Sequence, residues 1–435
     1  MKKACLKEFG RYASLNVLGM IGLSCYILAD TFFVARGLGS SGLAALNIAI
    51  PVFSLIHGTG LMLGIGGATG YSISKSQGNQ NKGDRFFSHT VILGSLFAVL
   101  YMVIGFLFSG QISFVLGADG DTFEMCRTYL RVLLLFSPFF IFNNIFISFV
   151  RNDGYPQRAM TAMLCGSFAN IIMDYIFIFP FKMGIAGAVL ATGVSPVISL
   201  IIIFPLALKK KIRFHLVKIK MSAKMCLNIL GSGIPSLITE LSSGIVIMIF
   251  NIIILGIEGN DGVAAYGVVA NISLVVIAIY TGISQGVQPL FSRYYGLGNN
   301  ETVKRLLKYS VTSVAVISFI VYSVIFVCSD FIAGIFNSEG NQTLQAIAVS
   351  GLKLYFLGCV FAGINIVLSV YFTSINDPKP AWVISLMRGF FVIIPLAFIM
   401  SAIWGMKGLW LVFPAAELIV CVVGVMIKKL YKSGK

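Results

Sequence analysis

Twelve stretches of mostly apolar residues follow one another along this chain of 435 residues, with short polar connections between them. A run of about 20 apolar residues is long enough to cross the hydrocarbon core of a bilayer as a helix. The sequence therefore predicts an all-α integral membrane protein with twelve transmembrane helices. The expected spans lie near residues 12–36, 44–74, 87–110, 123–149, 157–180, 184–207, 228–255, 263–290, 304–327, 345–372, 379–402 and 405–428.

The composition excludes the classes of protein that a strongly basic chain otherwise resembles. The chain is 57% hydrophobic and 11% charged, with a net charge of +16, whereas soluble domains carry roughly 45–50% apolar and about 25% charged residues. The charges form short clusters between apolar runs, so a disordered or nucleic-acid-binding chain is not expected. The eight cysteines are far apart, and we expect buried thiols and no cofactor.

The Lys and Arg residues alternate between the two sides of the predicted membrane. The termini and the even-numbered connections hold 25 of the 32 basic residues, and the odd-numbered connections hold only Arg36, Lys182 and Lys407. Because basic residues remain on the cytoplasmic side, this asymmetry predicts that both termini are cytoplasmic. The basic run from Lys209 to Lys224 is then a determinant of topology; a nucleic-acid or anionic-lipid patch is the alternative.

Four short segments of the first half recur in the second half at a spacing of 220–222 residues. The pairs are 42–45 with 262–265, 77–80 with 297–300, 153–156 with 375–378, and 184–187 with 405–408. Six spans per repeat place both repeats in the same orientation, an arrangement typical of transporters that alternate access around a central cleft. We therefore expect an N-terminal six-helix lobe (1–208), a basic cytoplasmic linker (209–224) and a C-terminal six-helix lobe (225–435).

Four of the sixteen acidic residues lie deep within predicted spans: Asp30, Asp174, Glu240 and Glu417. An acid in the hydrocarbon region is costly and marks an ion or substrate pathway by default. At 1.5 Å per residue, Asp30 and Asp174 each lie about 9 Å from the outer end of their spans, and Thr192 about 12 Å from it. Asn170 lies one helical turn from Asp174 on the same face.

These four side chains form a candidate site for a coupling cation. Two carboxylates, a carboxamide and a hydroxyl at one depth suit a small hard cation such as Na+, or two acids that share a proton. The site residues are Asp30, Asn170, Asp174 and Thr192. The positions equivalent to the two acids in the second half are Phe250 and Leu396, which disfavours a symmetric channel. The structural alternative is that the two acids pair with a membrane arginine such as Arg388 and hold helices together.

Three further residues are candidates for a substrate cleft: Tyr26, Glu240 and Arg388. Tyr26 lies one turn from Asp30, although an aromatic residue at this spacing is also typical of a helix core. Glu240 is equally compatible with a functional role and with a structural ion pair. Glu417 is expected to pack or to reach toward the lipid headgroups.

At this point the residues resemble the multidrug and toxic compound extrusion (MATE) transporters, over essentially the whole chain. Each motif is short, and their order along the chain carries the resemblance. The motifs are Ala29-Asp30-Thr31-Phe32-Phe33-Val34, Gln77-Gly78-Asn79, Arg151-Asn152-Asp153-Gly154 with Pro156, the segment 170–179, Gly187-Ala188 with Thr192, and Gly233-Ile234-Pro235 with Glu240.

The resemblance implies an exporter of amphipathic, often cationic, drugs and toxins that is driven by inward flow of H+ or Na+. The pattern of the first lobe is similar to the DinF-like and MepA-like bacterial branches, in which Asp30, Asn170, Asp174 and Thr192 would form the coupling-cation site. A further acid that some branches carry in the tenth span is absent between residues 345 and 372. We expect a monomer in a prokaryotic inner membrane, because two lobes in one chain need no partner subunit.

Two other functions compete with drug export. A lipid-linked oligosaccharide flippase of the same superfamily would share the two lobes but would need several cleft Arg or Lys residues for a pyrophosphate, and only Lys353 and Arg388 qualify. A membrane enzyme is less consistent with the sequence, because its three histidines show no spacing typical of a metal site or a nucleophile. The sequence does not distinguish H+ from Na+.

Overall fold

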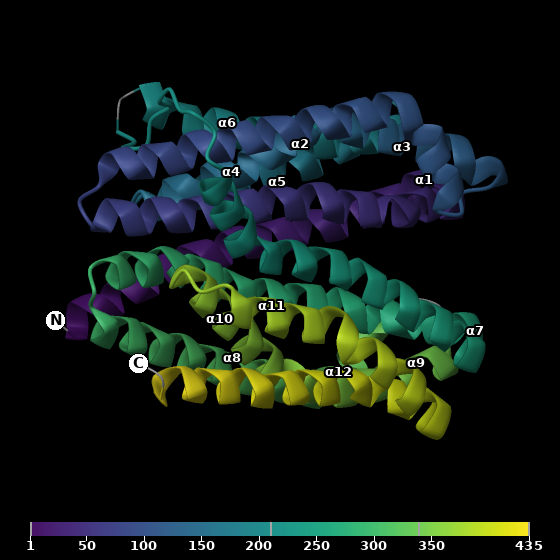
Figure 1. Ribbon diagram of the computed structural model, residues 1–435. Helices are drawn as coiled ribbons and strands as arrows, with labels where there is room; N and C mark the ends of the chain where they lie inside the picture. The colour runs from purple at the N-terminus through teal and green to yellow at the C-terminus, as the bar shows by residue number, and fades with distance from the viewer. Residues whose placement is uncertain (1, 209–210, 338–339, 434–435) are drawn as a thin grey trace.

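The computed structural model describes residues 2–208, 211–337 and 340–433 (Figure 1). The described residues are 91% helical and contain no β-strand. Figure 1 shows α1–α6 packed into one lobe and α7–α12 into a second. The first lobe contains α1 (Lys2–Ser76), α2 (Gln80–Val115), α3 (Gly120–Leu135), α4 (Ser137–Asn152), α5 (Pro156–Ile178) and α6 (Gly184–Leu208). The second contains α7 (Ala223–Gly296), α8 (Asn300–Phe336), α9 (Gln342–Tyr355), the 3-10 turn η1 (Phe356–Gly358), α10 (Cys359–Ser374), α11 (Lys379–Leu386), the π-helical turn η2 (Met387–Phe391) and α12 (Ile393–Ser433).

Three of these helices contain a sharp break at a glycine. The breaks lie at Gly39 in α1 (φ 67°, ψ −158°), Gly259 in α7 (φ 63°, ψ −150°) and Gly405 in α12 (φ 58°, ψ −138°). A residue with a Cβ is strained in this backbone region, so glycine allows the chain to reverse direction there. Over the described ranges, nine apolar stretches are long enough to cross a membrane. The three breaks divide three of them, which confirms the prediction of twelve spans.

Three predicted spans are interrupted rather than continuous. The expected helix 123–149 is bent by 47° between α3 and α4. Pro138 lies in the first turn of α4. Backbone N–H groups in the first turn have no acceptor within the helix, so the N–H that proline lacks costs no helical hydrogen bond there. The expected helix 345–372 passes through η1, and 379–402 passes through η2.

The internal repeat is visible in the backbone as well as in the sequence. Residues with positive φ recur at the spacing of the sequence repeat: Gly39 with Gly259, Gly78 with Gly298, Gly154 with Asn376, and Gly184 with Gly405. The helices that follow the turns at Gly78 and Gly298, α2 and α8, are also capped in the same way. Asn79 accepts a hydrogen bond from the backbone N of Lys82 at 2.9 Å, and Asn299 accepts one from Thr302 at 3.0 Å. The two halves therefore share one fold.

Each lobe has its own hydrophobic core, and α1 joins them. The start of α1 leaves the first lobe, and Cys5, Phe9 and Tyr12 are buried in the core of the second. Farther along the chain, α1 and α7 meet backbone to backbone. A Cβ on Gly233 would lie 1.9 Å from the carbonyl oxygen of Met62, so only glycine fits at this position. The lobes are thus in tight contact along α1 and α7 (Figure 1).

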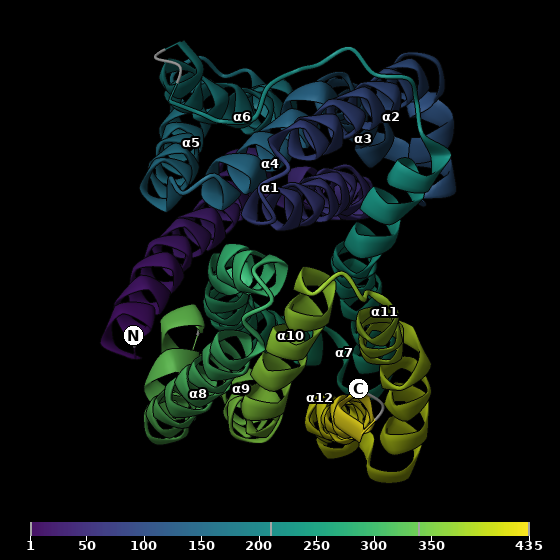
Figure 2. The same cartoon turned by 60° about the vertical axis from the view of Figure 1, so that its left-hand side comes forward.

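The connection between the lobes is an extended segment that we call the strap, residues 211–222. Figure 2 shows it running across the first lobe from α6 to α7. The predicted linker 209–224 overlaps it, although Lys209 and Lys210 lie outside the described residues and α7 already begins at Ala223. Phe214 anchors the strap, because its ring is 1% exposed and lies 4.6 Å from the ring of Phe87 and 5.5 Å from that of Phe149.

Candidate functional site

The two acids of the first lobe come together inside it. Asp30 lies in the first half of α1 and Asp174 in α5, and they are 7% and 0% exposed. Their carboxyl groups lie within hydrogen-bonding reach of each other. Because two carboxylates at this separation repel, one shared proton or one cation is needed to hold them together. The predicted proximity of Asp30 and Asp174 is therefore present in the structure.

Asn170 and Thr192 complete the cluster around Asp174. With its amide nitrogen toward the acid, Asn170 donates to Oδ2 of Asp174 at 3.0 Å, and its oxygen accepts from the backbone N of Thr192 at 3.2 Å. The hydroxyl of Thr192 donates to the carbonyl of Ala188, one turn back in α6, at 3.1 Å. Asn170 is fully buried and Thr192 is 4% exposed. All four predicted site residues therefore lie in one cluster on α1, α5 and α6.

One oxygen of each acid has no partner. Oδ1 of Asp30 and Oδ1 of Asp174 are buried and accept no hydrogen bond from any residue that the structure describes. A buried acceptor without a donor is costly, so these oxygens favour an added proton or cation. Within the described ranges, no group of three or more His, Cys, Asp or Glu residues is placed to hold a metal ion. A cation at this site would thus use the two carboxylates together with amide or hydroxyl oxygens.

Two tyrosines border the acids, and only one of them was predicted. Tyr26 is 8% exposed and lies close enough to interact with the charges of Asp30, Asp174 and Glu240. Tyr129, in α3, is 5% exposed and lies beside Thr192. The sequence carries no signal for Tyr129, because a tyrosine within an apolar span has no characteristic neighbours.

Glu240 lies between the two lobes and has a partner that sequence reasoning missed. Its carboxylate Oε2 is 3.7 Å from Nδ1 of His57, and the Glu240 side chain is 34% exposed. His57 is stacked on Phe53, with ring centroids 5.7 Å apart and an angle of 5° between the planes. His57 lies in the second half of α1 and Glu240 in α7, so this pair joins the first lobe to the second.

Arg388 does not reach the acids of the first lobe. Its Nε donates to Oε1 of Glu417 at 2.5 Å, and Asn365 donates to Oε2 of the same carboxylate at 2.7 Å. Glu417 is 1% exposed, so of the two expectations for this residue, packing inside the protein agrees with the structure and contact with the headgroups does not. Its buried position is stable because both of its oxygens are satisfied inside the second lobe. The alternative in which Arg388 pairs with Asp30 or Asp174 is also wrong.

A buried polar layer joins the lobes at the end of the bundle where α4 and α7 end. Arg151, at the end of α4, is 2% exposed and donates to Oδ1 of Asn16 at 2.5 Å. Asn16 in turn donates to the carbonyl oxygen of Gly282 in α7 at 2.9 Å. Nε of Arg151 has no acceptor among the described residues.

Gln288 of α7 is the centre of the same layer. Its Oε1 accepts from Asn152 at 2.8 Å, and its Nε2 donates to Thr69 at 2.9 Å and to Ser292 at 3.2 Å. All four residues are buried. Because Asn152 and Thr69 belong to the first lobe and Gln288 to the second, separation of the lobes at this end must break the two bonds that join them.

Comparison with known proteins agrees with this geometry. The MatE family model matches residues 17–176 and 235–399, one segment in each lobe. The chain is 26% identical to the multidrug export protein MepA of Staphylococcus aureus over 420 residues, which cover 96% of this chain and 92% of that protein.

Solved structures of MATE transporters have the same fold. A crystal structure of MATE in complex with MaL6 superposes with a TM-score of 0.93 at 25% identity and covers 98% of this chain and 96% of that one. An outward-facing multidrug resistance MATE family transporter of the MOP superfamily superposes with a TM-score of 0.91 at the same identity and the same coverage. This protein belongs to the MATE family of transporters, and within that family it is similar to MepA.

Proposed function

We propose that this chain exports amphipathic, often cationic, organic compounds from the cell in exchange for H+ or Na+. The observation that carries the proposal is the buried pair of Asp30 and Asp174, each with one carboxylate oxygen that lacks a donor. The name of the staphylococcal relative, a multidrug export protein, supports the same substrate class. The activity is transport, and the proposal includes no chemical reaction.

The coupling cation binds at Asp30, Asn170, Asp174 and Thr192. Its arrival neutralises the two acids and removes their mutual repulsion, so it stabilises the compact arrangement of α1, α5 and α6. Cation flow is coupled to drug transport when the cation and the drug each bind the outward-open and the inward-open state with different affinity. Tyr129 acts as a positioning residue, because its hydroxyl lies against Thr192.

Alternating access follows from the two-lobe architecture. The lobes 1–208 and 225–435 rock about their contact along α1 and α7, with the strap as the connection between them. In the arrangement described above, the polar layer around Arg151 and Gln288 closes the end of the bundle that we propose is cytoplasmic. Opening toward the cytoplasm breaks that layer, and opening to the outside leaves it intact.

The drug binds in the cleft between the lobes, near Glu240 and Tyr26. Glu240 is partly exposed and carries a negative charge at the level of His57 and Phe53. A carboxylate beside aromatic rings attracts an organic cation both by charge and through the ring faces. Arg388 is the third candidate of this cleft, although Glu417 already neutralises its charge.

The flippase alternative has less support than drug export. Its substrate carries a pyrophosphate, which would need free Arg or Lys side chains in the cleft. Arg388 pairs with Glu417, and Nζ of Lys353 lies 5.4 Å from the ring centre of Phe326. The two buried acids favour a cationic cargo and disfavour an anionic one.

The cellular setting follows from the pattern of basic residues and from the bacterial relative. The chain is a multi-pass membrane protein. We place it as a monomer in the inner membrane of a prokaryote, with both termini cytoplasmic. Its partners are the lipid bilayer and small-molecule drugs and toxins. The proposal includes no nucleic-acid partner and no cofactor. Reaction of single cysteines near each terminus with a membrane-impermeant reagent, in intact and in everted membranes, tests this orientation.

Ethidium transport by the purified protein tests the function and identifies the ion. Proteoliposomes are loaded with ethidium and exposed to a pH gradient alone, a Na+ gradient alone, or neither. We expect uphill ethidium movement with one gradient and none without a gradient. Absence of movement under both gradients, together with movement of a fluorescent lipid-linked sugar, would contradict drug export and support the flippase.

A further inference from the structure

The strap that joins the lobes is held against the first lobe through its backbone. The N–H of Arg213 donates to Oδ2 of Asp153 at 2.8 Å, that of His215 donates to Oδ1 of Asp84 at 3.1 Å, and that of Val217 donates to the hydroxyl of Ser88 at 3.0 Å. From Arg213 to Val217, every second amide is therefore bonded to the lobe, as in one edge of a β-ladder. The strap is an ordered part of the first lobe.

This pairing leaves the basic side chains of the strap free. In an extended chain, successive side chains point to opposite sides. Ile212 and Phe214 face the helices, whereas Lys211 and Arg213 are exposed. None of the ion pairs formed within the described ranges includes either of these two residues. A lysine and an arginine without acidic partners thus flank the apolar side chains of the strap.

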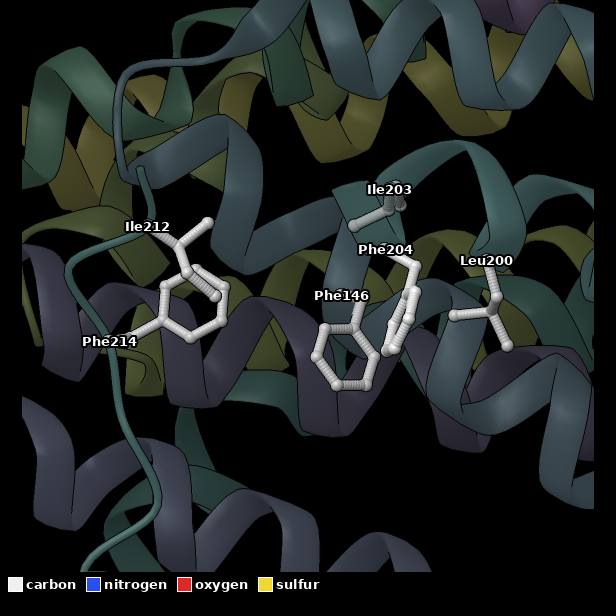
Figure 3. A pocket seen from close by; sticks show the side chains of 6 residues that line it. All are labelled: Phe146, Leu200, Ile203, Phe204, Ile212 and Phe214. Carbon is white, nitrogen blue, oxygen red and sulfur yellow. The ribbon is translucent and has the colours of Figure 1, made fainter. Parts of the chain in front are cut away.

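An apolar groove lies beneath this part of the strap. It has a volume of about 230 Å³, and all of its lining residues are apolar (Figure 3). Its lining residues are Phe146 of α4, Leu200, Ile203 and Phe204 of α6, and Ile212 and Phe214 of the strap. Drug-sized ligands occupy pockets of roughly 300–1,000 Å³ that include polar groups. The groove is therefore too small and too apolar for the exported cargo.

The position of the groove identifies the kind of molecule that covers it. It lies on α6, one of the apolar membrane spans. The outer wall is open, because Phe204 and its neighbour Ile201 are 60% and 61% exposed. Side chains exposed on the surface of a membrane span contact lipid acyl chains. A groove at the end of the span, bordered by unpaired basic residues, matches a lipid with an apolar chain and an anionic headgroup.

We propose that the groove formed by α4, α6 and the strap binds one acyl chain of an anionic phospholipid, and that Lys211 and Arg213 hold its phosphate. The long stems of these side chains reach from the strap toward the headgroup level while their charged ends remain hydrated. The site is separate from the cation site and from the drug cleft, and it does not depend on the transport function. The site selects an anionic headgroup over a neutral one, because Lys211 and Arg213, its two charged side chains, are both positively charged.

Quenching of a tryptophan by brominated lipids tests this site. The reporter is Phe204→Trp, which replaces one exposed aromatic ring of the groove by another. Purified protein is reconstituted in phosphatidylcholine that contains a small fraction of dibrominated phosphatidylglycerol or dibrominated phosphatidylcholine. The signal of the three native tryptophans is subtracted by comparison with wild type. The comparison reporter is Phe398→Trp, which lies in α12 and is 55% exposed.

We expect phosphatidylglycerol to associate on the order of tenfold more strongly than phosphatidylcholine at Phe204→Trp, and equally at Phe398→Trp. The preference should disappear with Lys211→Gln and Arg213→Gln together and fall about threefold with either change alone. It should persist with the exchange Lys211→Arg with Arg213→Lys, and with Lys218→Gln and Lys220→Gln, two exposed lysines farther along the strap.

Three results would overturn the proposal. Equal quenching by both lipids at Phe204→Trp would show that the groove does not select an anionic lipid. A preference that survives removal of both Lys211 and Arg213 would show that these residues do not hold the phosphate. Equal loss with Lys218→Gln and Lys220→Gln would show diffuse attraction by the whole strap instead of a site.

Discussion

Nε of Arg388 donates to Oε1 of Glu417 at 2.5 Å within the second lobe, and this contact distinguishes Glu417 from Asp30 and Asp174, the deep acids of the first lobe. Glu417 has all of its oxygens satisfied by Arg388 and Asn365. Asp30 and Asp174 face each other, and each has an oxygen without a donor among the described residues. The first arrangement satisfies both carboxylate oxygens within the fold, and we propose that the second binds a cation.

Removal of one partner from the Glu417 pair should destabilise the protein. Glu417→Gln leaves the partly buried Arg388 without its counter-charge, and breaking a buried ion pair costs up to about 3–5 kcal/mol. Replacing both residues, with Arg388→Met and Glu417→Leu, should restore stability to near that of wild type. Thermal unfolding in detergent, followed by the loss of monomer on size exclusion, measures both. Glu258→Gln, at an exposed site, is the control. A Glu417→Gln variant as stable as wild type would show that the pair does not stabilise the fold.

Loss of the Asp153 contacts should release the strap. Asp153 accepts hydrogen bonds from Tyr71 at 2.6 Å, from the backbone N of Arg213 at 2.8 Å, and from Lys75. Hydrogen bonds to a charged group contribute about 1.5–3 kcal/mol each. Asp153→Ala should therefore speed trypsin cleavage between the lobes by at least about tenfold. Gel analysis of the two half-chains gives the rate. Unchanged cleavage, or equal acceleration in Asp330→Asn, would contradict the role of Asp153.

The polar layer between the lobes should control opening at its end of the bundle. Gln288→Ala removes the bonds to Asn152, Thr69 and Ser292 and leaves their polar groups buried. Each unsatisfied group costs about 1–3 kcal/mol, and opening relieves this cost through hydration. Spin labels at Gln77 and Leu297, two exposed positions in equivalent turns of the repeat, should then show longer distances. Gln345→Ala is the control, and an unchanged distance distribution in Gln288→Ala would reject the idea.

The Tyr129 hydroxyl should tune coupling without being essential for folding. It lies beside Thr192, and a single hydrogen bond contributes about 0.5–1.5 kcal/mol. Tyr129→Phe should therefore reduce gradient-driven export by up to about tenfold and leave thermal stability near that of wild type. Tyr309→Phe, in the second lobe, serves as the comparison. Export at the wild-type rate in Tyr129→Phe would remove this residue from the site.

The membrane architecture and the core of the candidate site could be predicted from the sequence. An apolar run long enough to cross a bilayer has few alternative structures, so the spans were predictable from length alone. Asp30 and Asp174 could be matched by counting residues from the ends of their spans, because the rise of a helix is constant. The positive-φ residues Gly78 and Gly298 also repeat as the sequence pairs predicted.

The partners of the remaining polar residues could not be predicted, because they depend on how each helix is rotated. Glu417 packs inside the protein, as one of its two interpretations expected, but its partner Arg388 was not predicted. His57 approaches Glu240 only because α1 and α7 touch backbone to backbone. The strap is held by backbone amides, which are the same in every sequence and give no signal. Tyr129 belongs to a span that breaks, and the bend between α3 and α4 was not predicted.

The central claim is that the pair of Asp30 and Asp174 couples a cation to the drug, and Asp174→Asn tests it most directly. The protein is reconstituted in proteoliposomes, and two rates are measured on one preparation: exchange of labelled for unlabelled ethidium without a gradient, and uphill ethidium transport driven by the H+ or Na+ gradient that drives wild type. We predict that Asp174→Asn retains exchange and loses uphill transport, whereas Glu258→Gln retains both. Uphill transport by Asp174→Asn at the wild-type rate would contradict the account.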